Sequence, residues 1–68
     1  MIETYYVRRS ESGKETHNLD KLIVRMSTPD RVEALCNAAE SAIINPGRYY
    51  YTYKGNTQIA KFYVEEEN

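Results

Sequence analysis

The sequence predicts an α+β domain in which a four-stranded antiparallel sheet is covered on one face by a single helix, in ββαββ order. Three observations support this fold class. Segments rich in β-branched and aromatic residues occur at both ends of the chain, a helix start signal followed by helical spacing occupies the middle, and glycine-containing turns separate the strand segments. With 68 residues, the chain is expected to form one domain over residues 1–68, near the lower size limit for independent folding.

The first two strands are expected at residues 2–9 and 19–26. The segment between them begins with turn residues at 10–14, where Gly13 can adopt positive φ. Asn18 and Asp20 could hold a bulge at the start of the second strand. This hairpin is expected to point the following side chains toward the helix: Tyr5, Val7, Leu22, Val24 and Met26.

The helix has the clearest start and end signals. Thr28 is expected to be the N-cap, with Pro29 at the first helical position and Asp30 adding a negative charge at the positive end of the helix dipole. Asn45-Pro46-Gly47 ends the helix, because a proline cannot continue the hydrogen-bond pattern. Apolar residues at helical spacing predict the buried stripe: Val32, Leu35, Cys36, Ala39 and Ile43.

The last two strands, expected at 48–54 and 57–65, enclose the two-residue turn Gly55-Asn56. A two-residue turn pairs Lys54 with Thr57 and, further along, Tyr51 with Ala60 and Tyr49 with Phe62. The more apolar of the two resulting faces should meet the helix: Tyr49, Tyr51, Ala60, Phe62 and Val64.

The opposite face of the sheet has no second layer to cover it and combines tyrosines with cations. The chain holds seven tyrosines, which are favoured both in strands and at binding interfaces. The alternative interpretation is a solvated sheet face, since scattered apolar groups are normal on surfaces. The predicted partner-binding residues are Tyr6, Arg8, Lys21, Arg25, Arg48, Tyr50, Lys61 and Tyr63.

Three binding functions fit such a face. The first is a non-enzymatic protein-interaction module, in which tyrosine and arginine anchor the contact. The second is single-stranded RNA or DNA binding, with bases stacked on the rings, although a net charge of −1 lowers the attraction for phosphates. The third is homodimerisation across the sheet. A secondary acidic face on the helix is either solvated or meets a basic partner, and comprises Asp30, Glu33 and Glu40.

The sequence predicts neither catalysis nor a cofactor. His17 is the only histidine and lacks further ligands at metal spacing, and Cys36, the only cysteine, is expected to be a buried structural thiol. The longest apolar run, Leu22-Ile23-Val24, is too short to cross a membrane. The N-terminus lacks the features of a signal peptide, so a cytoplasmic site of action is expected.

In size and order of elements, the chain resembles small phage or mobile-element proteins that inhibit host or defence enzymes, including anti-CRISPR proteins. The resemblance covers the architecture and no sequence motif. It implies an inhibitory function without assigning it to any residue.

Overall fold

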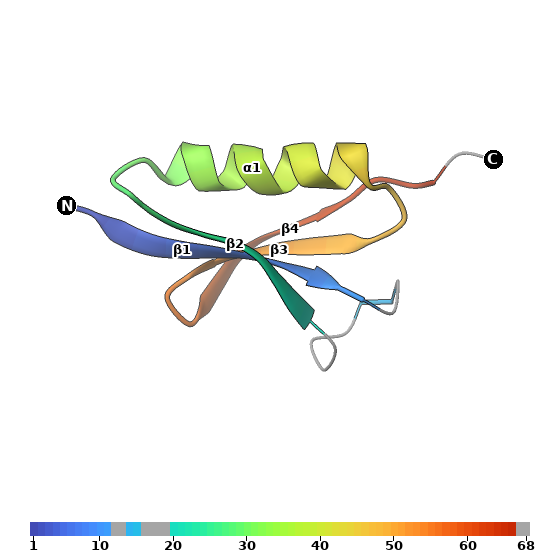
Figure 1. The fold of residues 1–68 in the computed structure, drawn as a ribbon, viewed down its shortest axis with the longest axis horizontal. Coiled ribbons are helices and arrows are strands. Elements are labelled where there is room, and N and C mark those ends of the chain that lie inside the picture. Colours follow the sequence, from blue (N-terminus) through green and yellow to red (C-terminus); the bar gives the residue numbers. More distant parts are fainter. Residues whose placement is uncertain (12–13, 16–19, 67–68) are drawn as a thin grey trace.

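The computed structural model describes residues 1–11, 14–15 and 20–66, and confirms the predicted α+β fold. One four-stranded antiparallel sheet is covered on one face by one helix (Figure 1). The elements are β1 (Glu3–Ser10), β2 (Asp20–Thr28), α1 (Arg31–Ile44), β3 (Tyr49–Lys54) and β4 (Thr57–Tyr63). Gly13, His17, Asn18 and Leu19, on which some sequence predictions rest, lie outside the described residues, as does Glu67.

The strand order in the sheet is β2-β1-β3-β4, so the two hairpins join through β1 and β3, and β2 and β4 form the edges. Helix α1 carries the chain from β2 to β3 across β1. Because β1 is antiparallel to both, β2 and β3 run in the same direction. Figure 1 shows β2 in front of the sheet and β4 at the back, which gives the crossover the usual right-handed sense.

A bulge in the first hairpin changes which residues of β2 face the helix. Val7 pairs with Val24, but the next residue, Arg8, pairs with Leu22, which leaves Ile23 as the extra residue. The expected inward positions of Tyr5, Val7, Val24 and Met26 hold, since cross-strand partners share a face. Beyond the bulge the faces exchange, so Leu22 lies on the face away from α1 and Lys21 on the helix side, which corrects both predictions.

A second bulge corrects the predicted faces of β3. The turn pairs Lys54 with Thr57 as expected, but Thr52 pairs with Ala60 and Tyr53 with Gln58, which leaves Ile59 as the extra residue of β4. Tyr50 and Thr52 therefore face α1, together with Ala60 and Phe62. The tyrosines predicted to be inside, Tyr49 and Tyr51, lie on the opposite face, because a shift of one residue reverses every side chain of a strand.

The helix packs on the sheet through small residues rather than through the predicted stripe. Ala34, Ala38 and Ala42 are fully buried, and the last two pack against Val7 and Tyr50. The large tyrosine ring on the inner face of the sheet leaves space only for small side chains opposite it. The predicted stripe of Val32, Leu35, Cys36, Ala39 and Ile43 lies further round the helix, with Val32 59% and Ile43 66% exposed and the Cys36 thiol exposed rather than buried.

The start of α1 lies two residues later than predicted. Asp30 is the N-cap, and its side chain accepts a hydrogen bond from the Val32 amide at 2.9 Å. Thr28, the predicted cap, is the last residue of β2. Its hydroxyl accepts a bond from the Asp30 amide and donates one to Glu33. The cap shifts because an aspartate after proline satisfies the free amides of the first turn equally well.

The end of α1 lies where the sequence predicts it. Asn45 is the C-cap, and Gly47 adopts φ +85°, a conformation that suits glycine. The Gly47 amide donates a hydrogen bond to the carbonyl of Val64 at 2.8 Å, which ties the end of the helix to the segment after β4. The described part of the chain contains no helix long and apolar enough to cross a membrane.

Candidate interaction surface

The sheet face turned away from α1, here called the outer face, carries most of the tyrosines. Cross-strand pairing places Tyr6 beside Tyr53, Arg8 beside Tyr51, and Tyr49 beside Tyr63. Two tyrosines, Tyr5 and Tyr50, are buried on the helix side. Five of the seven tyrosines in the chain therefore lie on the outer face, interspersed with cations and one leucine: Arg8, Arg25, Lys61 and Leu22.

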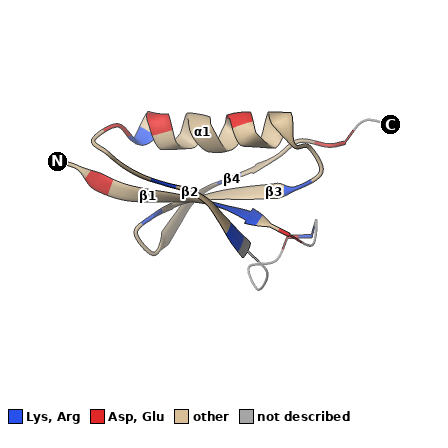
Figure 2. Ribbon diagram, in the orientation of Figure 1, with Lys and Arg blue, Asp and Glu red and all other residues tan. Residues whose placement is uncertain are grey.

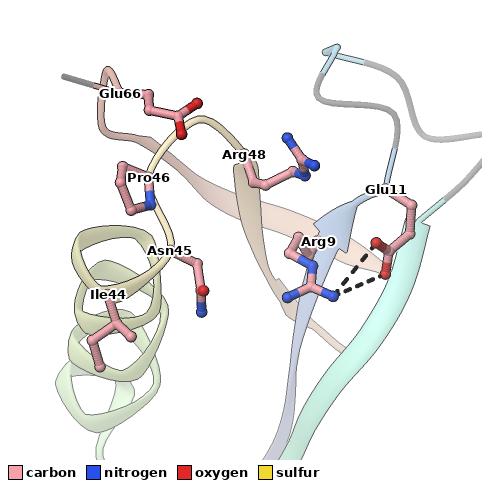
Figure 3. Close-up of a pocket in the computed structure, with 7 residues that line it drawn as sticks. All are labelled: Arg9, Glu11, Ile44, Asn45, Pro46, Arg48 and Glu66. Atoms are coloured by element: carbon pink, nitrogen blue, oxygen red, sulfur yellow. Dashed lines mark hydrogen bonds and ion pairs between the residues drawn. The ribbon is translucent and has the colours of Figure 1, made fainter. Parts of the chain in front are cut away.

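Five of the eight residues predicted to bind a partner lie on this face: Tyr6, Arg8, Arg25, Lys61 and Tyr63. The other three do not. Tyr50 is 1% exposed and forms part of the core under α1, and Lys21 lies on the helix side, opposite Arg9. Arg48 precedes β3 and lies beside the end of the helix (Figure 3).

Tyr51 is fully buried although it belongs to the outer face. No described helix or strand lies over that face (Figure 1), so its cover is not a second layer of secondary structure. Arg8 and Lys61 flank Tyr51 on the adjacent strands, and both are long enough to lie across a ring. The centre of the outer face is consequently packed, and its accessible groups lie around that centre.

The accessible part of the outer face near β4 is an ordered aromatic pair. The rings of Tyr49 and Tyr63 stack with their centroids 4.4 Å apart, and Tyr63 is 46% exposed. The ammonium group of Lys61 lies 6.0 Å from the centre of the Tyr49 ring and 2.5 Å from a carboxylate oxygen of Glu15. The hydrogen bond to Glu15, followed by its charge, raises the pKa of Lys61. These contacts hold the rings in place before any partner binds.

The residues missed by sequence reasoning are Tyr49, Tyr51, Tyr53 and Leu22. The alternate spacing of the three tyrosines in β3 is visible in the sequence. Both faces of this strand carry tyrosine, however, so alternation alone does not show which face is buried. The helix sequence holds the signal that could have shown which face of β3 is buried. Three alanines four residues apart form a narrow small-residue stripe, which fits against a large ring on the sheet.

The predicted acidic face is exposed on the helix layer. Asp30, Glu33 and Glu40 are all exposed, and Asp30 and Glu33 also take part in the hydrogen bonds at the start of α1. Figure 2 shows carboxylates on α1 and most of the cations on the strands and the segments that join them. The two layers therefore differ in the sign of their charge.

An open pocket of about 410 Å³ lies at the end of the molecule where α1 stops (Figure 3). Arg9 and Arg48 line it opposite Glu11 and Glu66, and Arg9 donates a hydrogen bond to Glu11 at 3.1 Å. The neighbouring Tyr50 hydroxyl and then Glu11 raise the pKa of Arg9, although the hydroxyl makes no hydrogen bond of normal geometry. With two cations balanced by two carboxylates, the pocket offers no net charge to attract an ionic ligand.

The described residues do not bring three metal-ligating side chains together. Comparison of the chain with family profiles, curated protein sequences and solved structures finds no match. Function therefore has to be inferred from the surface of the chain.

Proposed function

We propose that this chain is a non-enzymatic protein-interaction module that binds its partner through the outer face of the sheet. The observation that carries the proposal is the concentration of five tyrosines on a sheet face that no described helix or strand covers. Tyrosine and arginine are the residues most enriched among the energetic anchors of protein interfaces. Such a module acts by occupying its partner's surface, which is also how the inhibitors that it resembles in architecture would act.

The accessible groups define what the partner surface must offer. Tyr63 on β4 and Leu22 on β2 provide exposed apolar area at the two edges of the face, and Arg25 is exposed on β2, three residues after Leu22. Apolar area next to cations favours a partner with apolar contacts beside carboxylates. The stacked pair of Tyr49 and Tyr63 reduces the entropy that binding would cost, because the rings are already ordered.

A protein partner is favoured over single-stranded nucleic acid by the charges around the tyrosines. Nucleic-acid affinity depends on cations that are free to neutralise phosphates. On the outer face, Lys61 is already paired with Glu15, and the chain as a whole carries a net charge of −1. Protein contacts do not need a net positive field, since apolar burial supplies most of their free energy.

The test uses two charge reversals on the same strand. Arg25→Glu changes an exposed cation on the outer face, whereas Lys21→Glu makes the same change on the helix side of the sheet. Wild type and both variants, each tethered through the exposed N-terminus, are used to capture proteins from a lysate of the source cells. We expect the retained protein to be lost with Arg25→Glu and with Tyr63→Ser, but kept with Lys21→Glu.

The affinity of the purified retained protein is then measured for each variant. Arg25→Glu and Tyr63→Ser should each weaken binding by about 10-fold or more, since interface anchors typically contribute over 1 kcal/mol. Equal affinities for all three variants would remove the outer face as the binding site. Retention of an oligonucleotide instead, with affinity that falls steeply as salt is added, would replace the protein partner by nucleic acid.

A further inference from the structure

A second surface, separate from the outer face, combines a strand edge with an exposed apolar flank of the helix. Within the described part of the chain, β4 has a neighbouring strand on one side only. Of the three large apolar side chains that α1 exposes, Val32 and Ile43 lie on the flank above β4, and Ile44 lies on the other flank. At such a surface, the folded monomer leaves apolar side chains exposed to water and backbone N–H and C=O groups of the edge strand without a neighbouring strand.

The position of this stripe follows from the handedness of the helix. Successive residues of a right-handed helix turn by about 100°, so the stripe from Val32 to Ile43 lies roughly 120° round from the buried alanine face. In Figure 1, α1 runs from left to right with its alanine face downward, and β4 lies at the back of the sheet. The stripe then points backward, over β4, where Phe62 and Val64 are only partly buried.

We propose that this chain forms a homodimer in which β4 pairs with β4 of a second copy while the two α1 helices pack antiparallel. The two-fold axis would stand perpendicular to the sheet. It would produce a continuous eight-stranded sheet with both helices on the same face. This interface goes beyond the proposed function, and it leaves the outer face free on both copies.

A single two-fold axis can relate both the paired β4 strands and the packed α1 helices. The hydrogen bond between Gly47 and Val64 puts Val64 level with the end of α1. Ala60 lies four residues earlier on β4, about 13 Å away, which corresponds to roughly nine helical residues. Ala60 is therefore beside the middle of the stripe. An axis at that level brings Val32 of each copy against Ile43 of the other, with Leu35, Cys36 and Ala39 of the stripe between them.

The charges of the two sheet edges favour β4 over β2 for self-pairing. β2 carries exposed Lys21 and Arg25, and charges discourage pairing at a strand edge. Each edge strand contains one bulge, at Ile23 and at Ile59, so the bulges do not distinguish the two edges. In β4 the only charged residue is Lys61, which is paired with Glu15. Antiparallel pairing centred on Ala60 places Lys61 opposite Ile59 of the second copy, so the two ammonium groups are not opposed.

A stable dimer needs an interface that takes up a sizeable share of a chain this small. A standard interface buries roughly 800 Å² on each partner, about a sixth of the 4613 Å² that this chain exposes. The wall formed by α1 and β4 extends along the whole helix, which is roughly 21 Å long.

Sedimentation equilibrium at micromolar concentration tests the proposal. Wild type should sediment with twice the mass of one chain, and the double variant Val32→Glu/Ile43→Glu with the mass of one, because its dimer should be weakened by at least about 100-fold. Asn37→Glu, about 140° round the helix from the middle of the stripe, should remain dimeric. Far-UV circular dichroism checks that the variants are folded. A monomeric wild type, or a dimer disrupted by Arg25→Glu but not by the double variant, would overturn the proposal.

A second readout uses the natural thiol and needs no change in the interface. Cys36 is exposed on the stripe and is the only cysteine in the chain, so a short bifunctional maleimide should link two wild-type copies. In the double variant Cys36→Ser/Asn37→Cys the thiol moves about 100° round the helix, away from Val32 and Ile43, and linkage should be lost. Equal linkage in both proteins, or none in wild type, would contradict an interface along this stripe.

Discussion

The two faces of the sheet carry the same residue type in different surroundings. On the helix side, Tyr5 and Tyr50 are buried under a helix that contributes mainly alanine. On the outer face, Tyr51 is equally buried although no described helix or strand lies over it, and Tyr63 remains 46% exposed. The comparison shows that burial alone does not separate a structural tyrosine from a binding one. The element that covers the ring separates them.

The largest expected effect comes from removing an inner tyrosine. Tyr50→Ala should lower the free energy of unfolding by about 3–5 kcal/mol, because it leaves a large cavity under α1. On the outer face, Tyr63→Ala should cost less than about 1.5 kcal/mol, mainly through the lost stacking on Tyr49. Urea denaturation of both variants measures the difference. Equal losses would mean that the two faces contribute alike to the fold.

A smaller effect, of opposite sign, is expected at Thr52. Its hydroxyl is buried on the helix side and makes no hydrogen bond to a described group. Thr52→Val replaces that hydroxyl by a methyl group, and should raise the free energy of unfolding by about 1 kcal/mol. Thr57→Val, at an exposed position of β4, is the matched control and should change it little. Destabilisation by Thr52→Val would show that the hydroxyl is satisfied in the folded chain.

The smallest effect concerns the ion pair at the rim of the outer face. Glu15 raises the pKa of Lys61 in the folded chain, so the pair stabilises the fold while Lys61 is protonated and ceases to do so as the pH rises through that pKa. Lys61→Gln should therefore be slightly less stable than wild type at neutral pH, and the difference should vanish in strong alkali. Added salt should shrink it as well. A difference that grows with pH would contradict the assignment.

Sequence reasoning recovered the order of elements, the end of the helix and the turn at Gly55, because each depends on local chemistry such as a proline stop or a glycine with positive φ. It failed where one residue of register decides the result. The bulges at Ile23 and Ile59 have no composition signal of their own, and each reverses the faces beyond it.

The helix shows the same limit for packing. Its sequence contains two apolar stripes, one of alanines and one of larger residues, and hydrophobicity favours the larger. In the structure the alanine stripe faces the sheet instead, because the ring of Tyr50 already fills the space below the helix. The choice depends on the combined volume of two elements that are distant in sequence, so neither segment alone could have revealed it.

The most direct test of the outer face is to determine which tyrosine rings touch the helix in solution. Nuclear Overhauser contacts from the methyl groups of Ala38 and Ala42 should reach the ring protons of Tyr50 and be absent from those of Tyr49 and Tyr51. Contacts from these methyl groups to Tyr49 or Tyr51 would reverse the face of β3. The proposed interaction surface would then lose the tyrosines on which it rests.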